Sequence, residues 1–327
     1  MTVRGVERKY GKLSISSDTG EKMTDQKPSI GMTRRDFIAN TSKAAIGSAL
    51  LMGTTGKVFP GVEETKSATV VMIRDRNVLD ANRKVKYDVV LDMLDKAVTT
   101  LTGKDDPVGA WKTIIKPGDV VGIKTNEWER LSTPAEVENV LKKRVMDAGV
   151  PEANIGIGDR QVLSIPVFQK TTALINTRPI RSHHWAGVGT LIKNYVMFEP
   201  NPPDSPFHDD ACSRLAELWE YPIVKGKTRL NVLVMLTPQI HSTGPHGFHP
   251  RYLWPYYGLI VGFDPVAVDS TGVRILQAAR RAFFGDDRPL NPPPKHIFLA
   301  DTRYKLGTAD PNKIKLIKLG YEKDAFI

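Results

Sequence analysis

Short runs of Val, Ile and Leu alternate along the chain with stretches typical of helices, and this order constrains the fold more than any other feature. The apolar runs are continuous rather than interleaved with polar residues, as expected for parallel strands that are covered on both faces. Five runs are predicted as buried strands: 69–74, 119–124, 154–158, 230–236 and 259–263. This alternation predicts an α/β fold with a mostly parallel, doubly wound sheet and helices on both faces.

Two helix starts can be read from the sequence. The segment 133–136, Thr-Pro-Ala-Glu, predicts a capping box with Thr133 as N-cap, in a helix that ends at Gly149. Asp264, which a proline follows, predicts the N-cap of a second helix by the same logic. Asp269 falls about one turn inside that helix, where its carboxylate either faces a site or complements the helix dipole.

An arginine pair near the N-terminus resembles a twin-arginine export signal. Arg34 and Arg35 are followed one residue later by Phe-Ile, and an apolar stretch over 44–52 comes next. These nine residues cannot span a membrane, which takes about twenty as a helix, but they fit the apolar region of a signal peptide. A chance Arg-Arg pair before a buried helix is the alternative.

The predicted organisation follows from this signal. Residues 1–68 are predicted as an export leader and linker, with the twin-arginine signal at about 32–60, and residues 69–327 as a single α/β domain. The twin-arginine translocase is the expected partner during export, and the mature protein is expected in the periplasm or another extracytoplasmic space. No clean Ala-x-Ala cleavage site occurs, so an uncleaved leader would leave the protein tethered.

The charge and cysteine content exclude two classes of function. Ten of the 46 Lys and Arg residues and five of the 36 Asp and Glu residues lie in the first 60 positions, so the net charge of +10 is divided equally between leader and domain. The remaining excess is scattered and forms no basic stripe with aromatics, which argues against a nucleic-acid partner. Cys212 is the single cysteine, so the chain ligates no iron–sulfur cluster, and we expect a small buried side chain there.

Polar residues follow several of the predicted strands, where an open α/β sheet binds its ligands. Lys124 and Lys193 are the predicted catalytic residues, because a lysine binds an anion, polarises a carbonyl or, when desolvated, acts as a base. Asn126, Asp159 and Asn194 are predicted to bind and orient the substrate. The alternative for both lysines is a side chain that extends from a strand edge towards water.

Five of the seven histidines fall in the segments 183–184 and 241–249. His183, His241 and His246 are predicted as ligands of a divalent metal such as zinc, nickel or iron. The spacing matches no firm zinc signature, so hydrogen bonding to loop carbonyls, or acid–base chemistry without a metal, are the alternatives. We expect His183 and His241 to lie on one wall of one pocket, close to Lys193.

Several segments, in chain order, resemble the domain-of-unknown-function 362 family: 122–126, 156–159, 183–194, 230–245, 264–269 and 296–307. The Asp-Pro-Val-Ala-Val-Asp sequence at 264–269 and the His-to-Lys-Asn segment at 183–194 are the specific parts. The resemblance covers about residues 69–321 and implies an α/β fold. Members are often associated with ferredoxin-like iron–sulfur modules, which this chain lacks, and the family has no agreed reaction.

These observations support two hypotheses of different classes. The first is an exported enzyme, in one version metal-dependent, that acts on a small anionic or carbonyl-bearing molecule. The second is a non-catalytic ligand-binding, cofactor-binding or maturation protein that serves a redox partner protein. Stoichiometric metal in the purified protein would favour the enzyme.

Overall fold

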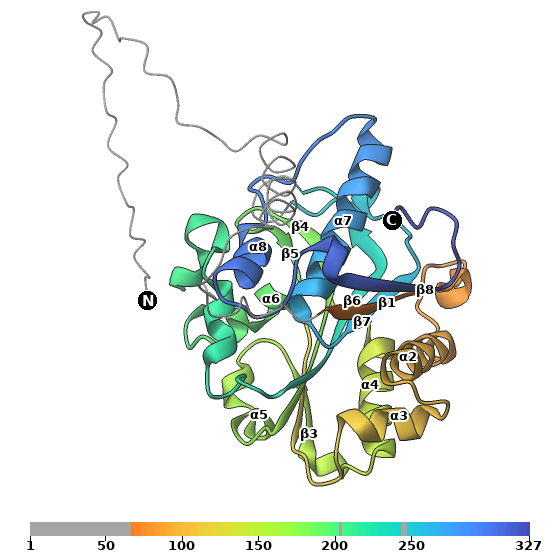
Figure 1. The fold of residues 1–327 in the computed structure, drawn as a ribbon, viewed down its shortest axis with the longest axis vertical. Helices are drawn as coiled ribbons and strands as arrows, with labels where there is room; N and C mark the ends of the chain where they lie inside the picture. Colours follow the sequence, from red (N-terminus) through yellow and green to blue (C-terminus); the bar gives the residue numbers. More distant parts are fainter. Residues whose placement is uncertain (1–66, 203–204, 243–246) are drawn as a thin grey trace, which may run out of the picture. The chain divides into compact units, whose positions relative to one another are not determined.

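The computed structural model describes residues 67–202, 205–242 and 247–327, which belong to one compact unit (Figure 1). Residues 1–66 of the predicted leader and linker, which include Arg34 and Arg35, lie outside the described residues, and so does His246. Within the described ranges, no helix is both long and apolar enough to cross a membrane.

An eight-stranded sheet runs through the described residues in the order β3-β2-β4-β6-β7-β1-β8, with β5 paired to β4. Its strands are β1 (Ala68–Arg74), β2 (Val121–Lys124), β3 (Ile155–Gly158), β4 (Ala173–His183), β5 (Gly187–Gly189), β6 (Thr228–Gln239), β7 (Gly258–Gly262) and β8 (Ile314–Gly320). The β7 strand is antiparallel to both of its neighbours and β5 is antiparallel to β4, whereas the other pairs are parallel. The predicted α/β fold with a mostly parallel sheet is therefore confirmed.

Helices cover both faces of the sheet (Figure 1). One face packs against α2 (Tyr87–Thr102), α3 (Pro107–Ile114) and α4 (Ala135–Asp147), through a core that includes Leu94, Trp111 and Val140. The other face packs against α5 (Pro166–Gln169), α6 (Leu191–Asn194), α7 (Pro265–Phe284) and α8 (Lys295–Thr302). The strands β1, β6 and β7 are almost wholly buried between these helices, which explains their continuous apolar runs.

The two predicted helix starts have different outcomes. Asp264 caps α7 as predicted, because its Oδ1 accepts hydrogen bonds from the amides of Val266 at 2.8 Å and Ala267 at 3.0 Å. The capping box at 133–136 is wrong: Pro134 is the N-cap of α4, and no side chain caps that helix. The Thr133 hydroxyl instead accepts a hydrogen bond from the Asn126 amide at 3.2 Å, so it closes the loop after β2.

The five predicted strands all occur, with ends that differ by up to three residues, but the sequence reading missed β4, β5 and β8. The eleven-residue β4 strand lies between β2 and β6 and is buried along nearly its whole length. Its sequence, Ala-Leu-Ile-Asn-Thr-Arg-Pro-Ile-Arg-Ser-His, has a continuous apolar run only at its start. A register shift between Pro179 and Arg181 accommodates the proline, which cannot donate to the ladder.

Candidate functional site

A buried ion pair joins the ends of β2 and β3. Lys124 is the last residue of β2, and its Nζ donates hydrogen bonds to Oδ1 of Asp159 and, at 2.8 Å, to the carbonyl of Thr125. Burial alone would raise the pKa of the Asp159 carboxyl, but the Lys124 charge and the Glu127 amide, at 2.9 Å from Oδ2, hold that pKa below its ordinary value. Burial lowers the pKa of Lys124, and the Asp159 charge opposes that shift, so the two side chains form a buried ion pair.

Asn126 connects this ion pair to β4. Its Oδ1 accepts a hydrogen bond from Nη1 of Arg181 at 2.8 Å, and its Nδ2 lies 3.5 Å from Oδ2 of Asp159. The Arg181 guanidinium also stacks on Trp128, with Cζ 4.2 Å from the ring centroid. Burial lowers the pKa of Arg181, and the charge of Arg178 lowers it further.

Arg178 lies deeper in β4 and is also buried. Its Nη1 donates to the Thr190 carbonyl at 3.2 Å, while its Nε has no hydrogen-bond partner in the described parts of the chain. Burial lowers the pKa of Arg178 to about 10, against the opposing charges of Asp159 and Asp269. Gly189 makes room for this guanidinium, because a Cβ there would lie 2.7 Å from Nη2.

The short helix α6 is held in place by a carboxylate from another helix. Asp269 of α7 accepts hydrogen bonds from the amides of Leu191 at 3.0 Å and Ile192 at 2.8 Å, and burial raises its pKa to about 7. Asn194, at the end of α6, donates to the carbonyl of Lys124 at 3.2 Å and to Oδ1 of Asn176 at 2.9 Å. The predicted residues Asn194 and Lys124 are thus in direct contact.

In the sequence of α6, Lys193 lies between Ile192, whose amide donates to Asp269, and Asn194. Only 4% of its surface is exposed. Its Nζ lies 3.8 Å from Sγ of Cys212, and no carboxylate of the described residues is within ion-pair distance of it. Burial lowers the pKa of Lys193 to about 8, and the nearby charges of Arg178 and Arg181 act in the same direction. Cys212 is buried as expected, and burial raises the pKa of its thiol.

Six buried residues therefore form one electrostatic group, which we call the cationic cluster: Lys124, Asp159, Arg178, Arg181, Lys193 and Asp269. It contains four basic side chains and two carboxylates. Glu138 approaches its edge through a hydrogen bond from Thr125, but burial raises the pKa of Glu138 towards the neutral form. The cluster thus carries an excess of positive charge in a region from which water is largely excluded, and this favours binding of an anion.

Comparison with known families bears on this part of the chain. Residues 123–274 match the family model described as "Domain of unknown function (DUF362)". These residues form a DUF362 domain. Neither the curated proteins nor the solved structures include a significant match to the chain. The DUF362 domain begins in β2 and ends within α7, so it contains every residue of the cationic cluster.

The histidines of the DUF362 domain have different surroundings. His183 ends β4 and stacks on His184 at 4.9 Å between ring centroids, and burial followed by the charge of Lys193 lowers its pKa well below the ordinary value. His241 packs edge-on against Tyr252 at 4.8 Å and Phe284 at 5.3 Å. Burial also lowers the pKa of His241, with contributions from Arg280 and Arg288 and not from the groups near His183.

A metal site has no support in these positions. Among the residues that the structure describes, no group of three or more His, Cys, Asp or Glu side chains is arranged to hold a metal ion. His183 lies near Lys193, as predicted, but no contact connects it to His241 in the described residues. The shared pocket for these two imidazoles stays a prediction.

His296 lies outside the DUF362 match and was missed at the sequence level. It belongs to α8 and is fully buried, and neither ring nitrogen has a hydrogen-bond partner among the described residues. Burial lowers its pKa to about 3, with further contributions from Lys193 and Arg178. It therefore lies beside the cationic cluster as a neutral imidazole. A lone histidine in a proline-rich segment carries no sequence signal for such a role.

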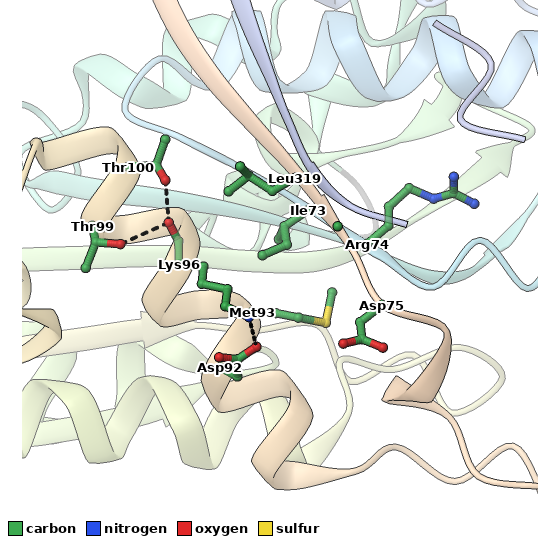
Figure 2. Close-up of a pocket in the computed structure, with 10 residues that line it drawn as sticks. Ile73, Arg74, Asp75, Asp92, Met93, Lys96, Thr99, Thr100 and Leu319 are labelled. Carbon is green, nitrogen blue, oxygen red and sulfur yellow. Dashed lines mark hydrogen bonds and ion pairs between the residues drawn. The ribbon is translucent and has the colours of Figure 1, made fainter. Parts of the chain in front are cut away.

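A surface pocket occurs elsewhere, where β1 and β8 end beside α2 (Figure 2). Lys96 and Asp92 form an ion pair at 2.6 Å on its α2 side, and Ile73, Met93 and Leu319 supply apolar surface. Arg74 points away into the C-terminal segment, where its Nη1 donates to the carbonyl of Lys323 at 2.7 Å. None of the predicted site residues lines this pocket, and its polar groups already have partners, so it is the weaker candidate.

Proposed function

We propose that the protein is an exported enzyme that acts on a small anionic or carbonyl-bearing molecule at the cationic cluster. One observation carries this proposal: the buried cluster contains four basic side chains and two carboxylates, and Nε of one of them, Arg178, has no partner in the described residues. A buried charge without compensation is costly, so a bound anion would stabilise this arrangement. Guanidinium groups suit carboxylate and phosphate ligands in particular, because they bind them in a bidentate manner.

The proposed roles differ among the predicted residues. Arg178 and Arg181 would hold the anion, and Lys193 would contact the reacting part of the molecule. Lys124, Asn126 and Asp159 already bond to one another or to their neighbours, so their proposed role is to position Arg181 and the loop after β2. Asn194 retains an unpaired Oδ1 in the described structure, which suits a donor group on the ligand.

Export and location form a second part of the proposal, and they rest on the sequence alone. Arg34 and Arg35 with the apolar stretch after them support a route through the twin-arginine translocase to the periplasm. Replacing both arginines with lysine should leave the protein in the cytoplasm, as measured by cell fractionation. Normal export of the double variant would refute the proposed signal.

A binding or maturation protein that serves a redox partner is the alternative function. The observation that favours it is that Lys124 and Asp159, two of the predicted site residues, are hydrogen-bonded to each other and to backbone groups rather than free to act on a substrate. Metal analysis of the purified protein adds a discriminating measurement. Stoichiometric metal would favour a metal-dependent enzyme over this alternative.

Calorimetric titration with malonate tests the anion site, because malonate carries two carboxylates and no ketone. We expect binding to the wild-type protein and to an Arg214→Gln control, whose arginine is exposed and paired with Glu217. Arg181→Gln should weaken binding by about tenfold or more, the effect of losing one charge-assisted hydrogen bond. Equal affinity in the two variants would contradict a site at the cationic cluster.

A further inference from the structure

Lys193 has surroundings that are unusual for a buried lysine. Its Nζ has a single hydrogen-bond partner in the described structure, the Cys212 thiol at 3.8 Å, although an ammonium carries three donors. Its charged neighbours are of the same sign, Arg178 and Arg181. Lys124 in the same cluster has the opposite arrangement, with a carboxylate in contact.

Both features favour the neutral amine at Lys193. Removal from water disfavours the ammonium form, and nearby positive charges disfavour it further. The pKa of about 8 means that about one tenth of Lys193 is uncharged at pH 7, and this neutral fraction is about tenfold larger than for a lysine whose pKa is one unit higher. A neutral, desolvated amine beside another cation is the arrangement by which lysine becomes a nucleophile towards carbonyl carbon.

Two neutral imidazoles lie near this amine. His183 and His296 are close enough to Lys193 to be influenced by its charge, and burial lowers their pKa values far below 7. They therefore add no negative charge that would stabilise the ammonium. The Trp185 ring, with its centroid 6.0 Å from Nζ, is itself 43% exposed, so the amine lies one side chain beneath the surface.

We propose that the Lys193 amine forms an imine with a small 2-oxo acid whose carboxylate binds between Arg178 and Arg181. The proposal rests on the function proposed above, since the same site must accept the anion. The nitrogen lone pair attacks the ketone carbon, the C=O electron pair moves to oxygen, and a proton passes from nitrogen to that oxygen to give a carbinolamine. Loss of hydroxide with one proton as water, as nitrogen forms the C=N bond, completes the step without an oxidant or reductant.

Reductive trapping tests this step. The full-length protein as isolated is incubated at pH 7.5 with pyruvate and cyanoborohydride, which reduces imines, and the modified lysines are located by peptide mass spectrometry. We expect Lys193 to acquire the reduced pyruvyl adduct at least about tenfold faster than exposed lysines such as Lys225, since each unit of pKa changes the neutral fraction tenfold. Lys124 should stay unmodified, which makes it an internal control in the same digest.

Two variants and one competitor complete the experiment. Lys193→Arg should abolish the adduct at that position, and Cys212→Ser should retain it, which would exclude chemistry at the thiol. Labelling of Lys193 at the same rate as Lys225 would overturn the proposal, and this comparison within the wild-type protein holds even if a variant fails to fold. Malonate should slow labelling of Lys193 and leave Lys225 unchanged.

The measurements separate the two proposals. Malonate binding without selective labelling of Lys193 would refute the imine and leave the anion site in place. Selective labelling of Lys193 that malonate does not slow, together with no detectable binding of malonate, would support the reactive amine and refute the proposed anion site.

Discussion

Lys124 and Lys193 are both buried lysines of one cationic cluster, and they differ in what surrounds the amine. Lys124 donates to Asp159 and to a backbone carbonyl, and Asp159 receives a further amide from the loop after β2. Lys193 has a thiol as its partner in the described structure, and Arg178 and Arg181 are near it. Burial lowers the pKa of both lysines, but the Asp159 carboxylate opposes this shift at Lys124, whereas the charges of Arg178 and Arg181 reinforce it at Lys193.

This difference indicates that the two ends of the cluster have different roles. At the end formed by β2 and β3, the charges of Lys124 and Asp159 compensate each other. Asn126 bonds to Asp159 and Arg181, so this end suits a role in positioning Arg181. At the end near α6, Nε of Arg178 has no hydrogen-bond partner in the described residues, and Lys193 contacts a thiol rather than a carboxylate. This end therefore suits the binding of an anion. We therefore expect four substitutions to distinguish the two ends, from the largest effect to the smallest.

Removal of the Lys124 amine should have the largest effect on stability. Lys124→Met leaves Asp159 buried without its partner, so we expect the free energy of unfolding to fall by about 3–5 kcal/mol in urea denaturation. Lys96→Met is the matched control, because Lys96 pairs with Asp92 on the exposed surface of α2, and it should cost less than about 1 kcal/mol. Similar losses in the two variants would show that the Lys124 ion pair contributes no more than a surface pair.

Removal of the Lys193 amine should instead stabilise the protein at neutral pH. The pKa of Lys193 is about 8 in the folded protein against 10.5 for the unperturbed side chain, so the unfolded chain binds more protons between these pH values. Wild-type stability therefore gains from this group as the pH rises through that range. The advantage of Lys193→Met over wild type should shrink by about 3 kcal/mol between pH 8 and 10.5.

The groups that face Lys193 set the background of this measurement. Burial lowers the pKa of Arg178 to about 10 and also lowers the pKa of Arg181, so these guanidinium charges contribute to the pH dependence of both proteins. Burial lowers the pKa values of His183 and His296, so both imidazoles are neutral above pH 8, and burial raises the pKa of the Cys212 thiol that contacts Lys193. Both proteins should therefore carry Cys212→Ser. A stability difference that does not change with pH would contradict the destabilised ammonium.

Asp269→Asn should have an intermediate effect and act on the Lys193 end alone. An amide side chain offers one acceptor oxygen where the carboxylate offers two, so one α6 amide, of Leu191 or Ile192, loses its partner at a cost of about 1–3 kcal/mol. The measurement belongs at pH 8, above the Asp269 pKa of about 7, where the carboxyl is ionised. We also expect slower trapping at Lys193, and an unchanged trapping rate would argue against a positioning role for Asp269.

Asp264→Ala should have the smallest effect on stability and should not change the reactivity of Lys193. Loss of the α7 cap costs about 1 kcal/mol in typical helices, and the Thr308 amide, 2.9 Å from Oδ2, also loses its acceptor. Asp264 touches neither lysine in the described structure, so the melting temperature should fall without a change in trapping at Lys193. A change in trapping would mean that the whole of α7, and not Asp269 alone, positions α6.

Much of the scaffold could be predicted from the sequence, because its signals are local. The apolar runs of β1 and β6 and the Asp-Pro start of α7 each depend on a few adjacent residues. The capping box failed because Thr133 bonds to Asn126 across a loop, a contact that spacing along one helix does not reveal. The organisation of the site depends on contacts of this second kind.

The strand that organises the site was missed for a related reason. In β4 the positions that face the cluster are polar, Asn176 and Arg178, and Pro179 interrupts the ladder, so the run lacks the pattern of a buried strand. Local rules commonly fail at functional sites, where residues are retained for chemistry rather than propensity. Arg178 and Arg181 lie close to the apolar run that begins β4, and this was the available signal for a buried basic site. It could be interpreted only once that segment was known to be a buried strand.

The contacts of the cluster also bear on how the chain reaches its native state. Arg181 and Asn126 are 55 residues apart, Asn194 and Lys124 are 70 apart, and Asp269 and Leu191 are 78 apart. Closing loops of this length costs entropy that only later contacts repay, so such pairings form slowly. Because Asp269 is the last of these residues to leave the ribosome, the α6 segment can acquire its capping carboxylate only after α7 has been synthesised. We therefore expect the β2–β3 pair, which joins Val121 to Ile155, to gain protection from hydrogen exchange before the amides of Leu191 and Ile192 do.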